Sequence, residues 1–273
     1  MSKKRENAKR LDFFARRPVF TSEEFTSFLD ADGVRSPRTR EALLAHHVRT
    51  GRIYRVRRGM YVSVPFGFTP DTYPVDPFIL AGKMSSDAVL AYHTALQFFG
   101  KAHSVREEMI FLTGQAIRPM TFRGYEYRGV AFPKRLVDKK QELFGVNVVE
   151  RTGIAIKVTS LERTLVDLLD RPVFGGGWEE IWRSLESVEF FDIDKIIEYT
   201  KLLGNSTTAA KVGFYLEQHR KELMVDDKHL NHLQEYCPKQ STYMSRNVCG
   251  RLVKKWNLVV SDQILDRSWE KTY

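Results

Sequence analysis

The sequence predicts an α+β protein in which an N-terminal winged helix-turn-helix domain precedes a larger mixed α/β domain. Two observations lead to this prediction: residues 1–65 show three helical signals followed by a hairpin signal, and the same segment holds most of the net positive charge. At 273 residues the chain is long enough for two domains with separate cores. Its 42% hydrophobic content favours a globular chain over a disordered one.

Three consecutive N-terminal segments carry helical signals. In the first, "AKRLDFFARR", apolar residues fall on one helical face. The second, "TSEEFTSFLDADG", has Thr21 and Glu24 at the spacing of a capping box. The third, "RSPRTREALLAHHVRTG", has Ser36 as its N-cap and Pro37 at the first helical position.

An alternating segment, "IYRVRRGMYVSV", follows the third helix and predicts a β-hairpin with its turn at Arg58-Gly59. Three helices followed by a hairpin, within about 65 basic residues, is the order of a winged helix-turn-helix. The sequence therefore predicts a DNA-binding domain over residues 1–65.

Positive charge supports this prediction. Residues 1–65 contain 15 Lys and Arg against 7 Asp and Glu, a net charge of +8, whereas the whole chain carries +9. A basic domain joined to a nearly neutral one indicates a polyanionic partner, and we expect double-stranded DNA.

The side chains suited to DNA contact lie at the start of the third helix and on the hairpin, where they can bind phosphates or base edges. They are Arg35, Ser36, Arg38, Thr39, Arg40, Arg55, Arg57 and Arg58. Arginine suits these positions because its planar guanidinium binds phosphate or guanine through two hydrogen bonds. His46 and His47 could either approach DNA phosphates or sit against the first helix.

A cluster of prolines in "VPFGFTPDTYPVDP" predicts a linker over residues 66–77, with the second domain over 78–273. There we expect a helix over 85–100, strands within 107–114, 125–132 and 146–158, and several further helices. The final stretch "MSRNVCGRLVKKWNLVVS" could form either a strand or a helix.

One helix of the second domain, "TSLERTLVDLL", has Thr159 and Glu162 at the spacing of a capping box. Arg163 and Asp167 are four residues apart on this helix, which predicts a surface ion pair.

No enzyme signature stands out in the second domain, which contains no GxxxxGK[ST], GxGxxG or HExxH motif. The glycines of "FGGGW" fit a connector better than a phosphate cradle, and His93 fits a core position better than a catalytic one. Glu150 and Lys157 flank a β-like segment, an arrangement that only loosely resembles the acidic–lysine pattern of metal-dependent nucleases. We therefore expect no catalytic residues and no cofactor.

Four potential zinc ligands, His229, His232, Cys237 and Cys249, lack the paired spacing of a zinc site, so we expect no metal. Two cysteines are too few for a disulfide framework. The chain has no apolar run of membrane-spanning length and no signal-peptide core, so a cytoplasmic protein without membrane contact is expected.

The order of these motifs resembles the AbiEi family of bacterial antitoxins and transcriptional regulators linked to phage defence. The similarity rests on "TGRIYRVRRGMYV", "AYHTALQFFG", "IKVTSLERTLVDLL" and "AAKVGFYLEQ". The resemblance implies that the N-terminal winged helix binds inverted repeats in the promoter and so represses the protein's own operon. It also implies that the C-terminal domain counteracts a co-encoded nucleotidyltransferase toxin without forming a stable complex, the type IV arrangement.

Two other functions remain open on the sequence. One is a nuclease-like DNA-processing enzyme targeted by the winged helix. The other is a plain transcriptional regulator whose second domain senses a ligand.

Overall fold

The computed structural model describes residues 3–34, 36–245 and 248–270, apart from the side chains of residues 3–6 and 270. Its N-terminal unit contains the three predicted helices, α1 (Lys3–Arg16), α2 (Ser22–Ala31) and α3 (Pro37–Arg49). The predicted hairpin is formed by β2 (Ile53–Arg57) and β3 (Met60–Ser63). A short strand that was not predicted, β1 (Val19–Thr21), pairs antiparallel with β3, giving the sheet order β1-β3-β2.

The predicted capping box at the start of α2 is confirmed. Thr21 Oγ1 accepts a hydrogen bond from the backbone N of Glu24 at 3.2 Å, and Glu24 Oε2 accepts one from the backbone N of Thr21 at 2.8 Å. These two bonds satisfy backbone donors that would otherwise be unpaired at the helix start. The residues around the β1–α2 junction thus set where α2 begins.

An aromatic core joins the three helices to one face of the small sheet. Its buried members are Phe13, Phe14, Phe20, Phe25, Leu29 and Ile53. His47 is buried with them, and its ring meets that of Phe14 edge-on at 4.9 Å between centroids. Of the two alternatives for His47, the structure therefore shows the one against the first helix, and His46 is exposed.

A six-stranded mixed sheet forms the centre of the molecule, with the order β6-β7-β5-β4-β9-β8. Its strands are β4 (Val89–Leu90), β5 (Glu108–Thr113), β6 (Met120–Phe122), β7 (Tyr125–Ala131), β8 (Val146–Arg151) and β9 (Ile154–Thr159). The strands predicted within 107–114, 125–132 and 146–158 are confirmed, and the last forms the hairpin β8–β9. Three short helices accompany the sheet, α4 (Pro77–Gly82), α5 (His93–Phe98) and α6 (Lys134–Asp138).

The single helix predicted over 85–100 is wrong. Val89 and Leu90 form the strand β4, and α5 begins only at His93 after Tyr92, whose φ is 56°. The apolar run is buried on both sides of the sheet, with Val89 in one core and Leu90 in the other. Such a doubly buried strand has no alternation that would distinguish it from a buried helix.

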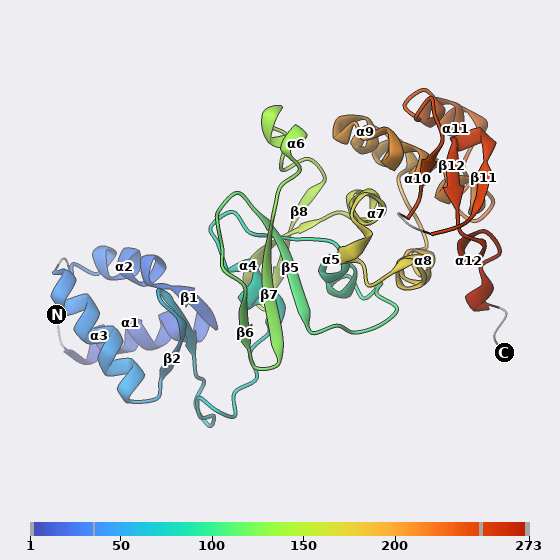
Figure 1. The fold of residues 1–273 in the computed structure, drawn as a ribbon. Helices are drawn as coiled ribbons and strands as arrows, with labels where there is room; N and C mark the ends of the chain where they lie inside the picture. The colour runs from blue at the N-terminus through green and yellow to red at the C-terminus, as the bar shows by residue number, and fades with distance from the viewer. Residues whose placement is uncertain (1–2, 35, 246–247, 271–273) are drawn as a thin grey trace.

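Helices dominate the region after the sheet (Figure 1). They are α7 (Leu161–Asp170), α8 (Trp178–Glu186), α9 (Ile193–Leu203), α10 (Ser206–Gln218) and α11 (Asp227–Gln234), with the 3₁₀ turn η1 (Pro172–Phe174) between α7 and α8. None of the described helices has the length and apolar content to cross a membrane.

The cap predicted for α7 is shifted by one residue. Ser160, not Thr159, is the N-cap, and its Oγ accepts a hydrogen bond from the backbone N of Arg163 at 3.3 Å. Thr159 instead completes β9 opposite Val146, and its hydroxyl lies 2.7 Å from that of Thr164. Pairing in the sheet therefore determines which of the two adjacent hydroxyl residues begins the helix.

The final stretch forms a small sheet in the order β10-β12-β11. The elements are β10 (Thr242–Tyr243), β11 (Arg251–Val253), η2 (Lys254–Trp256), β12 (Leu258–Val260), α12 (Asp262–Leu265) and η3 (Ser268–Glu270). The sequence left strand and helix open for residues 244–261. The described part of this stretch contains the two strands β11 and β12 with the 3₁₀ turn η2 between them, and no α-helix.

The N-terminal unit lies at one end of the molecule and the small C-terminal sheet at the other (Figure 1). The face of the N-terminal sheet that points away from its helices packs on the central region, where Met60 and Val62 share an apolar cluster with Ile79 and Met84. The segment predicted as a linker, 66–77, holds no helix or strand before α4. This segment is nevertheless attached to the central sheet, because Arg123, in the turn between β6 and β7, donates hydrogen bonds to the carbonyls of Pro70 and Tyr73.

Candidate nucleic-acid interface

The first turn of α3 presents three of the predicted DNA-binding side chains to solvent. Ser36 is the N-cap, Arg38 and Thr39 follow it, and all three are exposed. The Ser36 hydroxyl makes no capping hydrogen bond, and the first turn contains no acidic residue. The backbone donors and the positive end of the helix dipole are therefore available to an anion next to Arg38. Arg35 lies outside the described residues.

Arg40 has a different arrangement from the one expected for a DNA-contacting side chain. Its Nε donates to the carbonyl of Val34 at 3.0 Å, and its guanidinium pairs with Asp30 near the end of α2. Only 16% of the side chain is exposed. Arg40 therefore braces the turn between α2 and α3, a contact that spacing along α3 could not predict.

The hairpin arginines also differ in their exposure to solvent. Arg55 and Arg58 are exposed, and Arg55 Nε donates to the carbonyl of Arg57 at 3.2 Å. Arg57 is half-buried and its guanidinium donates to the carbonyl of Met84, outside the N-terminal unit. Burial lowers the pKa of Arg57. Arg57 thus joins the hairpin to the central region, while Arg55 and Arg58 remain open.

The hairpin tip is fixed to the start of α2. Gly59 has φ +77°, a conformation that side-chain-bearing residues rarely adopt, and its carbonyl accepts a hydrogen bond from the backbone N of Ser22 at 2.8 Å. A Cβ at this position would lie 3.3 Å from Ser22 Oγ. The turn therefore holds Arg58 in a defined place beside α2.

A polar groove of about 810 Å³ lies between this hairpin tip, the start of α2 and the loop after α4. Four of its lining residues are basic, Arg17, Arg57, Arg58 and Lys83. Glu24 also lines it and forms an ion pair with Lys83. Lys83 was not among the predicted binding residues, because only the tertiary structure brings it to the hairpin.

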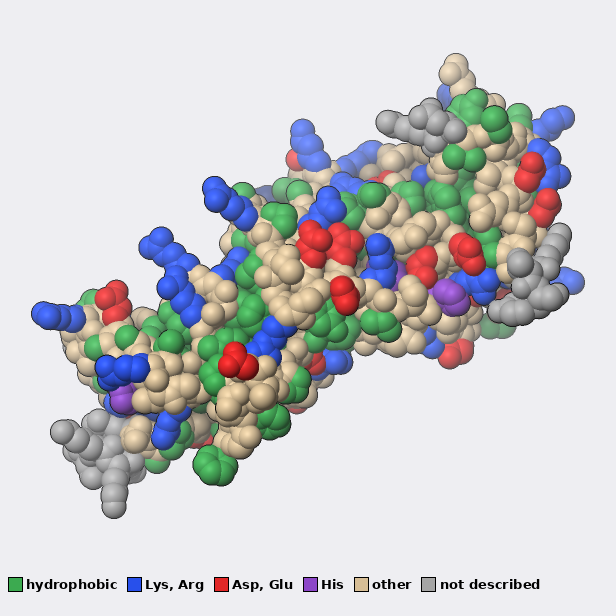
Figure 2. All heavy atoms as spheres, turned by 60° about the horizontal axis from the view of Figure 1, so that its bottom comes forward, with side chains coloured by type: hydrophobic (Ala, Val, Ile, Leu, Met, Phe, Trp, Pro, Cys, Tyr) green, Lys and Arg blue, Asp and Glu red, His purple; other side chains and the backbone are tan. Residues whose placement is uncertain are grey.

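Side-chain charge differs between the two ends of the molecule. Figure 2 shows Lys and Arg side chains along the whole visible face, with few acidic side chains at the N-terminal end and more over the middle and the C-terminal end. This distribution agrees with the net charge of +8 on residues 1–65. The electrostatic field of this excess positive charge attracts polyanions to the N-terminal end.

In the central and C-terminal regions, side chains that were considered as catalytic residues or metal ligands make contacts within the protein. His93 is buried between Gln97 and Glu180, with 2.9 Å from Nδ1 to Gln97 Oε1 and from Nε2 to Glu180 Oε1. The Sγ of Cys237 donates to the carbonyl of Leu233. Among the described residues, no group of three His, Cys, Asp or Glu side chains could hold a metal ion.

The fold is similar to that in the crystal structure of the RV2827C protein from Mycobacterium tuberculosis. The TM-score is 0.61 at 15% sequence identity, and the match covers 94% of this chain and 91% of that one. At this identity the similarity establishes a shared fold and nothing about activity. No protein-family model and no curated protein matches the chain.

Proposed function

We propose that this chain is a DNA-binding antitoxin of the AbiEi kind that represses its own operon. The observation that supports DNA binding best is the N-terminal unit itself: the element order α1-β1-α2-α3-β2-β3, the sheet order β1-β3-β2, and an exposed basic first turn on α3. These features fit a winged helix-turn-helix in which α3 enters the major groove and the hairpin tip lies beside the adjacent backbone.

The contacts within the protein refine the roles of the predicted residues. In this proposal the exposed residues Ser36, Arg38 and Thr39 contact bases or phosphates, and Arg35 keeps its predicted role on the sequence alone. The exposed Arg55 and Arg58 contact phosphates. Arg40 and Arg57 are positioning residues, because each guanidinium is held by another part of the chain.

Binding of the DNA upstream of its own gene tests the repressor function. Fluorescence anisotropy of the full-length protein would compare that duplex with a scrambled one of equal length between about 50 and 200 mM salt, where phosphate contacts lose affinity steeply. We expect tighter binding to the native duplex at every salt concentration. Equal affinity for both duplexes would contradict a sequence-specific repressor.

The antitoxin part of the proposal rests on the resemblance, and its partner is a co-encoded nucleotidyltransferase toxin. A full-length variant is a better test than residues 78–273 alone, because the fragment would expose cluster residues such as Ile79 and Met84 that pack on the N-terminal sheet. In toxin-expressing cells, we expect the double variant Arg38→Ala/Arg58→Ala to restore growth but fail to repress the promoter. Failure of wild-type protein to restore growth would contradict the antitoxin function.

A further inference from the structure

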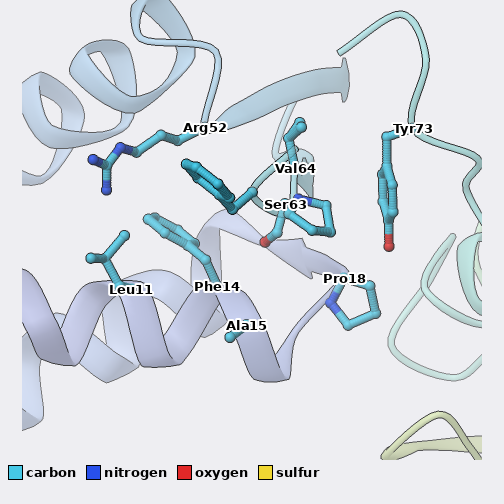
Figure 3. A pocket seen from close by; sticks show the side chains of 10 residues that line it. Leu11, Phe14, Ala15, Pro18, Arg52, Ser63, Val64 and Tyr73 are labelled. Atoms are coloured by element: carbon cyan, nitrogen blue, oxygen red, sulfur yellow. The ribbon is translucent and has the colours of Figure 1, made fainter. Parts of the chain in front are cut away.

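A pocket of about 500 Å³ opens between α1 and the segment that leaves β3. Its lining is predominantly apolar and includes Leu11, Phe14, Pro18, Val64, Phe66 and Tyr73. Figure 3 shows Leu11 and Phe14 rising from α1 on one side, Val64 across from them and Tyr73 at the far end. The volume lies within the range of small-molecule sites.

Arg52 is the one charged residue among the described residues that line this pocket. It is exposed, and within the described part of the chain no hydrogen bond or ion pair occupies its guanidinium. Figure 3 shows the Arg52 side chain extending along the upper wall toward the Leu11 end. A guanidinium at the edge of an apolar pocket can bind a carboxylate through two parallel hydrogen bonds.

Besides Arg52, the polar side chains among the described lining residues are Ser63 and Tyr73. Ser63 is buried, and its Oγ donates to the carbonyl of Arg17 at 2.7 Å, which leaves the hydroxyl oxygen able to accept a hydrogen bond but not to donate another. The aromatic walls suit a flat or branched hydrocarbon body. Phe66, fully exposed at the rim, would lose contact with water when such a body is bound.

We propose that this pocket binds a small amphipathic carboxylate, with its aromatic or branched apolar body against Phe14 and Tyr73 and its carboxylate on Arg52. The walls come both from α1 and from the segment that Arg123 ties to the central region. A bound carboxylate therefore contacts the N-terminal unit and its connection to the rest of the chain at once. The proposal is independent of DNA binding.

The test is isothermal titration of the full-length protein with 2-naphthoate and with its uncharged analogue 2-naphthamide. We expect 2-naphthoate to bind with one-to-one stoichiometry in the micromolar to low millimolar range, as suits a ligand of about a dozen non-hydrogen atoms. The amide has the same apolar body without the charge, so we expect it to bind at least about tenfold more weakly.

Two variants locate the site, and Arg49→Gln serves as the matched control because Arg49 is an exposed arginine nearby that does not line the pocket. We expect Arg52→Gln to weaken 2-naphthoate binding at least about tenfold and Arg49→Gln to leave it unchanged. Ala15→Leu, at an exposed helical position that lines the pocket, should weaken both ligands by filling space. Thermal unfolding of each variant without ligand checks that it is folded.

Three results of the titrations would overturn the proposal. They are the absence of 2-naphthoate binding up to about 5 mM, equal affinity for acid and amide, and equal losses in Arg52→Gln and Arg49→Gln. Sedimentation without ligand provides the remaining check. A stable dimer that Ala15→Leu dissociates would identify the apolar face as an interface between two copies, and would also overturn the proposal.

Discussion

Arg163 and Asp167, four residues apart on α7, form an ion pair that is almost completely shielded from solvent, with 3.3 Å between Nε and Oδ2. The surface pair predicted from their spacing is therefore wrong, because only 1% and 2% of the two side chains are exposed. Arg163 Nη1 also donates to the carbonyls of Glu142 and Phe144, and the Tyr199 hydroxyl donates to Asp167 Oδ1 at 2.7 Å. These partners offset part of the cost of removing both charges from water. Among the described residues, Arg163 Nη2 has no hydrogen-bond partner, and burial raises the pKa of Asp167.

Removing one member of this pair should strongly destabilise the protein. We expect Asp167→Ala to lower the free energy of unfolding by about 3–5 kcal/mol, because it leaves the Arg163 charge buried without its partner. Asp12 and Arg16 provide the matched control: they have the same spacing and lie 3.0 Å apart, but are largely exposed. Arg16→Ala should cost at most about 0.5 kcal/mol. Urea unfolding at pH 7 measures both, and similar small losses would contradict the buried pair.

We expect loss of the Arg38 side chain to affect DNA affinity and loss of the Arg40 side chain to affect protein stability. Because Arg38 is exposed, we expect Arg38→Ala to weaken operator binding by about 1–3 kcal/mol without changing stability. Arg40→Ala should instead lower the free energy of unfolding by about 1 kcal/mol, since Asp30 and Val34 lose their partner. Operator titrations and urea unfolding of both variants separate the two effects. Arg49→Ala, at the other end of α3, is the control, and an unchanged affinity in Arg38→Ala would exclude this turn from the interface.

We expect Arg58 to contribute to DNA affinity by contacting a phosphate rather than a base. We expect Arg58→Ala to weaken binding to native and scrambled duplexes by the same factor and to reduce the slope of log K against log salt by about 1. The reason is that one fewer phosphate is neutralised and fewer counterions are released. A slope that stays the same in the variant would show that Arg58 makes no phosphate contact.

His47 should make the stability of the protein depend on pH. Burial, with a smaller effect from the neighbouring positive charges of His46, Arg10 and Arg52, lowers its pKa from 6.5 to about 4. Between these two values the unfolded chain binds a proton that the folded chain excludes, so stability is full above pH 6.5 and falls as the pH drops toward 4.

Urea unfolding between pH 7.5 and 4.5 would measure this dependence. His47→Phe keeps an aromatic ring against Phe14 and should flatten the pH profile in this window. The control His46→Gln changes the exposed neighbour and should leave most of the pH dependence in place. A profile that is identical in wild type and His47→Phe would contradict the assignment to His47.

Local signals predicted the N-terminal elements well. The capping box of Thr21 and Glu24, Pro37 at the start of α3 and the Arg58-Gly59 turn each act over a few residues, so their effect is visible in the sequence. Strand β1 was missed because its three residues are too few to show a periodic pattern.

The mixed α+β composition, the three N-terminal helices with their hairpin and the excess of positive charge at that end could all be predicted from the residues alone. Long-range packing makes Val89 and Leu90 a central strand and buries Arg163 and Asp167. It also decides that Arg40 and Arg57 are held by Asp30 and Met84, whereas Arg38 and Arg58 stay exposed. The physical reason is the same in each case: periodicity and caps are set by neighbours within about four residues, but burial and side-chain partners depend on segments that are distant in the chain.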